Sequence, residues 1–125
     1  MHNHLALIIE DNQDEAAFFA KALESSGFEI EIIKDGGQAI SRLAAIIPDL
    51  ALLDLHLPSV NGTAVLKHIR DDSRLAETPV IIVTGDPLAA EGLRDQTTLA
   101  LIKPIGFDQL RDLATRMTAT ASPAP

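Results

Sequence analysis

Short, continuously apolar runs recur along the chain, separated by segments that mix apolar and polar residues. An apolar run without alternation is typical of a strand buried on both faces of a parallel sheet. One segment, residues 29–32, alternates polar and apolar positions instead, which indicates a strand at a solvated edge of the sheet. The sequence therefore predicts five strands, the other four of them fully buried: residues 5–9, 29–32, 50–53, 80–83 and 99–102.

Amphipathic segments fill the intervals between these runs, with apolar side chains three or four positions apart, and this spacing predicts helices. The first helix ends at Gly27, because glycine readily adopts the left-handed conformation that follows a helix. The second has Ile47 as its last apolar position and ends before Pro48, and the third places Ala64 inward. The five helices are expected around residues 16–23, 40–47, 64–69, 88–93 and 110–117, the fourth being short.

Strands and helices alternate throughout, so the predicted fold class is α/β, with right-handed crossovers between parallel strands. An edge position for the second strand favours the order 2-1-3-4-5, the flavodoxin-like, doubly wound, five-stranded parallel sheet with five helices. The first and third strands are then neighbours, and their carboxyl ends flank the switch point where such sheets bind ligands. A chain of 125 residues is one domain; we expect residues 1–118 to form it and 119–125, rich in Pro, Ala and Ser, to be a linker or disordered tail.

Polar residues follow each of the strands predicted to be buried. Glu10 and Asp11 end the first strand, Asp54 the third, Thr84 the fourth and Lys103 the fifth. Clustered carboxylates repel one another, so they either take up a proton or bind a divalent cation, and all-oxygen ligands suit Mg²⁺. A carboxylate beside Mg²⁺ can attack phosphorus to give an acyl phosphate, whose charge then needs a cation and a hydrogen-bond donor. Lys103 and Thr84 would supply these two groups.

Composition narrows the function classes. A net charge of −8 argues against direct nucleic-acid binding, which requires clustered Lys and Arg. No apolar stretch approaches the ~20 residues that span a bilayer, and no signal peptide is recognisable, so we expect no membrane association. The absence of cysteine is compatible with a reducing cytoplasm. Phe18 and Phe19 are adjacent and cannot both face the core, so one of them is expected to be partly exposed.

The ordered polar residues resemble those of the receiver domain of bacterial two-component response regulators, over residues 5 to about 117. The resemblance implies that Asp54 accepts a phosphoryl group from a sensor histidine kinase or a phosphotransfer protein. It also implies that the domain then switches its interactions with a downstream protein or a fused output domain. The motifs that carry it are Glu10-Asp11, Asp54 within residues 52–62, Thr84-Gly85 and Lys103-Pro104.

The resemblance also implies a role for each site residue. Asp11 and Asp54 would bind Mg²⁺ directly, together with the backbone carbonyl of His56, and Glu10 would act mainly through water. Thr84 would hydrogen-bond the phosphoryl group and Lys103 would pair with it. The bond between Lys103 and Pro104 is cis in much of this family, which X-Pro bonds tolerate.

Three features depart from the family pattern near the fifth strand. Ala100 stands three positions before Lys103, where a switching Tyr or Phe is common. Only 19 positions (103 minus 84) separate Thr84 from Lys103, about one helical turn fewer than in many relatives. Thr97-Thr98 replaces a frequent Gly-Ala pair. We therefore expect the loop 85–88 to report phosphorylation, and a homodimer built on the fourth helix, fifth strand and fifth helix to be weak or differently arranged.

Two other functions stay open from the residues. A pseudo-receiver would keep the fold as an interaction module without phosphorylation. A small hydrolase with an aspartyl nucleophile would ordinarily carry a second carboxylate two residues after it, where this chain has His56, and 125 residues leave no cap domain. We expect no enzyme activity beyond the domain's own phosphorylation and dephosphorylation.

Overall fold

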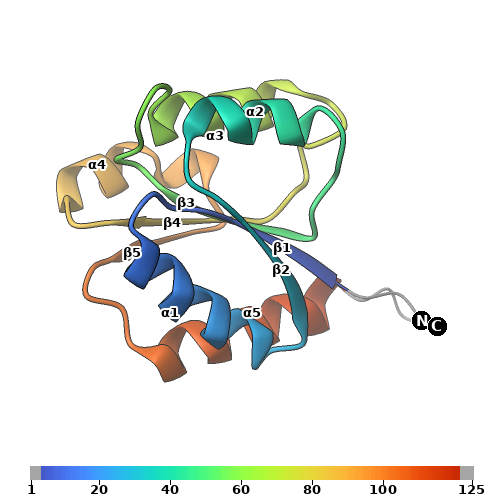
Figure 1. The fold of residues 1–125 in the computed structure, drawn as a ribbon, viewed down its shortest axis with the longest axis vertical. Coiled ribbons are helices and arrows are strands. Elements are labelled where there is room, and N and C mark those ends of the chain that lie inside the picture. The colour runs from blue at the N-terminus through green and yellow to red at the C-terminus, as the bar shows by residue number, and fades with distance from the viewer. Residues whose placement is uncertain (1–3, 122–125) are drawn as a thin grey trace.

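The computed structural model describes residues 4–121, which form a parallel sheet between two layers of helices (Figure 1). Helices α1 and α5 cover one face, whereas α2 and α3 cover the other and α4 lies beside β4 and β5. None of the helices in this part of the chain is long and apolar enough to cross a membrane. The elements are β1 (His4–Ile9), α1 (Gln13–Glu24), β2 (Phe28–Ile33), α2 (Gly36–Leu43), β3 (Leu50–Asp54), α3 (Gly62–Asp71), β4 (Val80–Thr84), α4 (Pro87–Gly92), a 3₁₀ turn (Arg94–Gln96), β5 (Leu99–Ile102) and α5 (Phe107–Ala121).

The strand order is β2-β1-β3-β4-β5, with every neighbouring pair parallel, which confirms the predicted fold and the edge position of β2. The register pairs Ile9 with Leu53, Asp54 with Val83, and Thr84 with Ile102. Because the strands run in one direction, this register brings the polar residues that end them to a single edge of the sheet.

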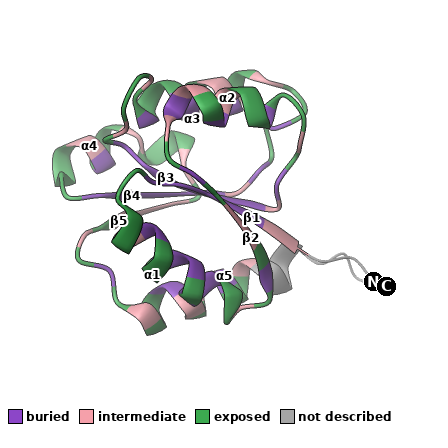
Figure 2. Ribbon diagram, in the orientation of Figure 1, coloured by how far each residue is buried: buried purple, intermediate pink, exposed green. Residues whose placement is uncertain are grey.

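The core consists of two layers, one on each face of the sheet (Figure 2). Leu52 and Ile81 point toward α1 and α5, whereas Leu53 and Ile82 point toward α2 and α3. Successive residues of a strand face opposite sides, so a strand covered on both sides must be apolar at every position. All four side chains are fully buried, and truncating one to alanine is expected to cost about 2–5 kcal/mol.

Two helix predictions are corrected. Helix α2 ends at Leu43 and Ile47 is 56% exposed, so Ile47 is not a helical core position. The Arg74 guanidinium donates to the carbonyl of Leu43 at 2.7 Å, which satisfies an oxygen that a longer helix would have paired. In α3 the buried residues are Gly62, Val65, Leu66 and Ile69, and Ala64 is exposed.

The remaining local predictions have mixed outcomes. Phe19 is 3% exposed and Phe18 39%, as expected for adjacent positions of a helix. Helix α4 is short, as predicted. Helix α5 extends through Ala121, so residues 119–121 of the expected tail are helical, and residues 122–125 lie outside the described residues.

The two edge strands differ from the central ones and from each other. The expectation that β5 is fully buried is wrong: its first three residues are half-buried and Ile102 is 41% exposed. The reason is its place at the end of the sheet, where β4 is its only neighbouring strand among residues 4–121. The other edge strand, β2, carries Glu29 and Glu31, and Glu31 pairs with Arg42 of α2 at 2.7 Å.

Candidate functional site

Asp54 is the last residue of β3 and is buried with both carboxylate oxygens occupied. Its Oδ1 accepts the backbone N–H of His56 at 2.8 Å, and its Oδ2 accepts Nζ of Lys103 at 3.0 Å. The start of α3 fixes this strand end, because the N–H of Gly62 donates to the carbonyl of Leu55 at 3.0 Å. A Cβ atom at position 62 would lie 2.3 Å from the carbonyl oxygen of Asp54, so only glycine allows α3 to begin there.

Glu10 follows β1 and is also buried, with an exposed fraction of 1%. Its Oε2 accepts the backbone N–H of Asn12 at 3.1 Å, whereas its Oε1 has no hydrogen-bond partner. Burial, together with the neighbouring Asp54 carboxylate, raises the pKa of Glu10 to about 8. The carboxyl group therefore holds a proton at neutral pH unless a cation replaces it.

Lys103 joins the carboxylates from the far side of the site. Its backbone N–H donates to the carbonyl of Thr84 at 2.8 Å, and its bond to Pro104 is cis, as the family resemblance implies. Nζ of Lys103 lies 3.5 Å from Oε1 of Glu10 and 3.0 Å from Oδ2 of Asp54. Burial lowers the pKa of Lys103, but the carboxylates around it raise that pKa further, so the ammonium stays charged.

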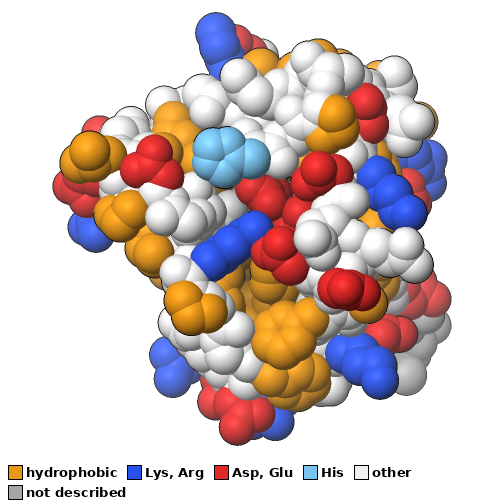
Figure 3. Space-filling model, turned by 60° about the vertical axis from the view of Figure 1, so that its left-hand side comes forward, with side chains coloured by type: hydrophobic (Ala, Val, Ile, Leu, Met, Phe, Trp, Pro, Cys, Tyr) orange, Lys and Arg blue, Asp and Glu red, His pale blue; other side chains and the backbone are white. Residues whose placement is uncertain are grey.

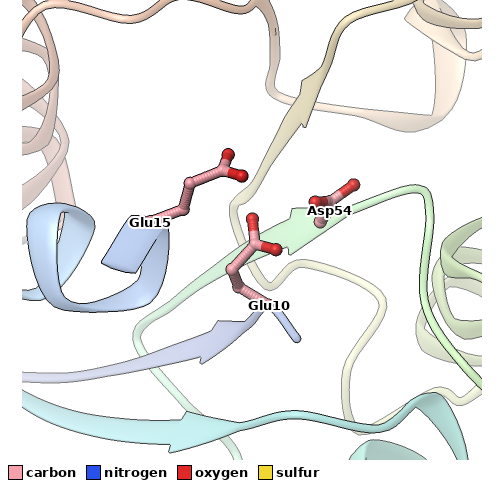
Figure 4. Close-up of side chains that lie close together, drawn as sticks. All are labelled: Glu10, Glu15 and Asp54. Atoms are coloured by element: carbon pink, nitrogen blue, oxygen red, sulfur yellow. The ribbon is translucent and has the colours of Figure 1, made fainter. Parts of the chain in front are cut away.

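Glu15, in the first turn of α1, belongs to the site although sequence reasoning missed it. Oε1 of Glu15 lies 2.5 Å from Nζ of Lys103. Figure 4 shows Glu10, Glu15 and Asp54 converging from α1 and the ends of β1 and β3, and one oxygen from each lies within 4.8 Å of the others. Three carboxylates, one of them with a buried oxygen that accepts no hydrogen bond, fit the oxygen-rich coordination that Mg²⁺ prefers.

The other predicted site residues lie at or just after the ends of β1, β3 and β4. Asp11 is exposed, immediately after Glu10, and its carboxylate is not among the three that cluster within the described residues. His56 is exposed, and its backbone forms the turn after Asp54. Thr84 is fully buried at the end of β4, and its Oγ1 accepts the N–H of Asp86 at 3.1 Å, which closes the loop before α4.

A groove of about 500 Å³ adjoins the carboxylate cluster. Figure 3 shows acidic side chains gathered next to a basic one, with a hydrophobic patch directly below them. The half-exposed ring of Phe18 packs edge-on against Phe107, with 6.0 Å between ring centroids. The groove is lined by Asp14, Glu15, Phe18, Phe19, Lys103, Pro104 and Ile105.

Comparisons with known proteins agree with this geometry. Residues 6–115 match the family described as response regulator receiver domain. The chain is 33% identical over 118 residues to the probable methanogenesis regulatory protein FilR2 of Methanothrix harundinacea, covering 86% of this chain and 76% of that protein. It is 38% identical over 79 residues to the polar-differentiation response regulator DivK of Brucella anthropi, covering 63% of this chain and 64% of DivK. Among solved structures, the signal receiver domain of a Luxo repressor protein from Vibrio parahaemolyticus aligns with a TM-score of 0.86 and 28% identity, over 96% of this chain and 93% of that one.

Proposed function

The chain belongs to the response regulator receiver domain family of two-component systems, and from this premise we propose that it accepts a phosphoryl group on Asp54. The observation that carries the proposal is the convergence on Asp54 of the Lys103 ammonium at 3.0 Å and of the buried Glu10 carboxyl, whose Oε1 accepts no hydrogen bond. A buried acid at a strand end, facing a charged donor, is arranged to react rather than only to cap a helix.

Phosphorylation of Asp54 requires one bond to form and one to break. A carboxylate oxygen of Asp54 attacks phosphorus, and the bond from phosphorus to the donor imidazole nitrogen breaks, leaving the electron pair on that nitrogen. Lys103 pairs with the phosphoryl oxygens as charge moves onto the group, and the hydroxyl of Thr84 donates to them. Hydrolysis later adds water to phosphorus, releases phosphate and restores the Asp54 carboxylate.

At this edge of the sheet Mg²⁺ would be held through Asp54 of the cluster and through Asp11 beside it, with the backbone carbonyl of His56, and with Glu10 acting mainly through water. The ion would offset the charge of the carboxylates and of the incoming phosphoryl oxygens. Binding the cation would displace the proton from Glu10, which the buried position of that carboxyl otherwise favours.

The groove beside Lys103 supports a protein as the phosphoryl donor. Phe18 is half-exposed within a few residues of Glu15 and offers apolar area for a partner next to the acceptor. We assign this surface to a sensor histidine kinase or phosphotransfer protein, in the cytoplasm. Phe18→Ser should weaken transfer from such a protein while leaving phosphorylation by a small acyl phosphate unchanged.

The proposed function is tested with acetyl phosphate and Mg²⁺, followed by intact-protein and peptide mass spectrometry. We expect a gain of ~80 Da on Asp54, the size of a phosphoryl group, that a chelator prevents and Asp54→Asn abolishes. Labelling of Asp54→Asn to the same extent would refute the assignment. No labelling of the native chain would favour a pseudo-receiver, and turnover of a generic phosphoester would favour a hydrolase.

A further inference from the structure

Glu15 stands where a helix usually uses a glutamate for capping, but its carboxylate is directed elsewhere. It is the third residue of α1, and its backbone N–H donates to the side chain of the N-cap, Asn12, at 2.9 Å. In a capping box the glutamate at this position reaches back to the backbone N–H of the N-cap. Here that N–H donates to Oε2 of Glu10 instead. The carboxylate of Glu15 is therefore not needed to cap α1.

The carboxylate of Glu15 forms an ion pair with Lys103 instead. An ammonium has three N–H donors, and three carboxylates surround this one: Glu15 at 2.5 Å, Asp54 at 3.0 Å and Glu10 at 3.5 Å. The shortest of the three contacts is to the residue that the phosphorylation chemistry does not use. Lys103 is thus shared between α1 and the acceptor, with Glu15 on the solvent side at 39% side-chain exposure.

We propose that Glu15 is a positioning residue that competes with the phosphoryl group for Lys103 and thereby limits accumulation of the phosphorylated form. The inference rests on the proposed function of Asp54. A phosphoryl group brings nearly two negative charges and three acceptor oxygens to the position that Lys103 serves. Lys103 must then divide its donors between that group and Glu15, and the Glu15 carboxylate repels the new charge. Both effects favour the unphosphorylated chain.

The test compares Glu15→Gln with Asp14→Asn. Both substitutions remove one carboxylate from the first turn of α1, but among the described residues the ion pairs of Lys103 are with Glu10, Glu15 and Asp54 and not with Asp14. We measure binding of beryllofluoride, a phosphoryl mimic, in Mg²⁺ by titration, and the fraction phosphorylated by acetyl phosphate at steady state. Glu15→Gln should bind beryllofluoride about fivefold tighter, the effect of removing a partly exposed like charge, and Asp14→Asn should change binding by less than about twofold. The difference should shrink in high salt, because partly exposed charges are screened.

Each outcome decides the matter. If the native chain binds no beryllofluoride, the proposed function itself fails. If the native chain binds it and Glu15→Gln binds no tighter than Asp14→Asn, Glu15 is only a surface ion-pair partner and the inference is overturned. Titration with Mg²⁺ alone tests whether Glu15 is instead a metal ligand. A tenfold or larger loss of Mg²⁺ affinity in Glu15→Gln would show that it is, and would also overturn the inference. Glu15→Asp keeps the charge on a shorter side chain and should bind the mimic with intermediate affinity.

Discussion

The acceptor edge (Glu10, Asp54 and Lys103) and the β5 face (α4 and β5) lie on one sheet but are built differently. At the acceptor edge, Glu10 and Asp54 are buried at the ends of the central strands β1 and β3, and Lys103 reaches them from the end of β5. On the β5 face, α4 has 6 residues, Leu88 is 84% exposed and Ile102 is 41% exposed. The comparison indicates that the two acceptor-edge carboxylates are fixed by central strands, whereas the elements at the β5 side of the sheet are short and partly exposed.

The prediction with the largest effect tests the acceptor edge. Lys103→Met should lower the rate of Asp54 phosphorylation by acetyl phosphate by roughly 10²–10³-fold, as expected for loss of a donor to developing charge. The matched control is Lys67→Met, which removes an exposed lysine paired with Asp71 at 2.7 Å on α3. Rates are measured by quenched mass spectrometry, and equal rates for the two variants would show that the chemistry does not need the ammonium at this edge.

A second prediction concerns the cation. Mg²⁺ at 100 times its dissociation constant should raise the free energy of unfolding by about 2.7 kcal/mol, measured by urea denaturation. Asp11→Asn should remove most of this gain, whereas Asp86→Asn, at the start of α4 on the β5 face, should retain it. Unfolding curves that Mg²⁺ does not shift would contradict a metal site among these carboxylates.

A third prediction uses the pH dependence of Glu10. Its pKa is about 8 in the folded chain, above its ordinary value of 4.5, so the folded state binds a proton that the unfolded state releases in this interval. Without metal, stability should therefore fall as pH rises from about 5 to 8, by about 2 kcal/mol once relaxation of the site is allowed for. In chelator, Glu10→Gln should flatten this slope and Glu91→Gln, on exposed α4, should not. Parallel slopes in all three proteins would show that Glu10 ionises normally.

The smallest effects are expected on the β5 face. Leu88→Ser should change the free energy of unfolding by less than about 0.5 kcal/mol, because this side chain buries almost no area.

The response of this face to phosphorylation should also be small. Beryllofluoride should alter hydrogen exchange in residues 85–88 and leave hydrogen exchange in β5 unchanged, because Ala100 has no ring to move. Sedimentation should show weak self-association at most. Tight dimerisation that Arg111→Glu on α5 abolishes would show that the surface of α4, β5 and α5 keeps the usual output arrangement.

Sequence patterns were sufficient for the topology and for most of the acceptor edge. The alternation in residues 29–32 identified one edge strand, and the carboxyl ends of parallel strands necessarily meet at one edge. From these two facts, the sequence alone predicts that Glu10, Asp54, Thr84 and Lys103 lie at the same edge of the sheet. The roles of Asp11 and of the His56 carbonyl toward Mg²⁺ stay predictions.

The missed features depend on long-range geometry. Glu15 looks like an acidic residue in a first helical turn, and only the position of α1 against Lys103 gives it another partner. At the end of α2, the carbonyl of Leu43 accepts a hydrogen bond from Arg74, 31 positions later in the chain, a partner that local sequence patterns do not reveal. An apolar run such as residues 99–102 has the same pattern in a central strand as in an edge strand. The hydrophobic pattern therefore does not reveal how many strands lie next to it.

The unequal edge strands have a consequence for solubility. An exposed strand edge invites pairing with another chain, and proteins oppose this with charge or with short strands. Strand β2 uses charge, through Glu29 and Glu31, whereas β5 has only 4 residues and no charged one. Within the strand itself, β5 is protected by its short length and not by charge. Any substitution that extends β5 backward through Thr97 and Thr98 should therefore lower the concentration at which the protein stays monomeric, long before it alters the fold.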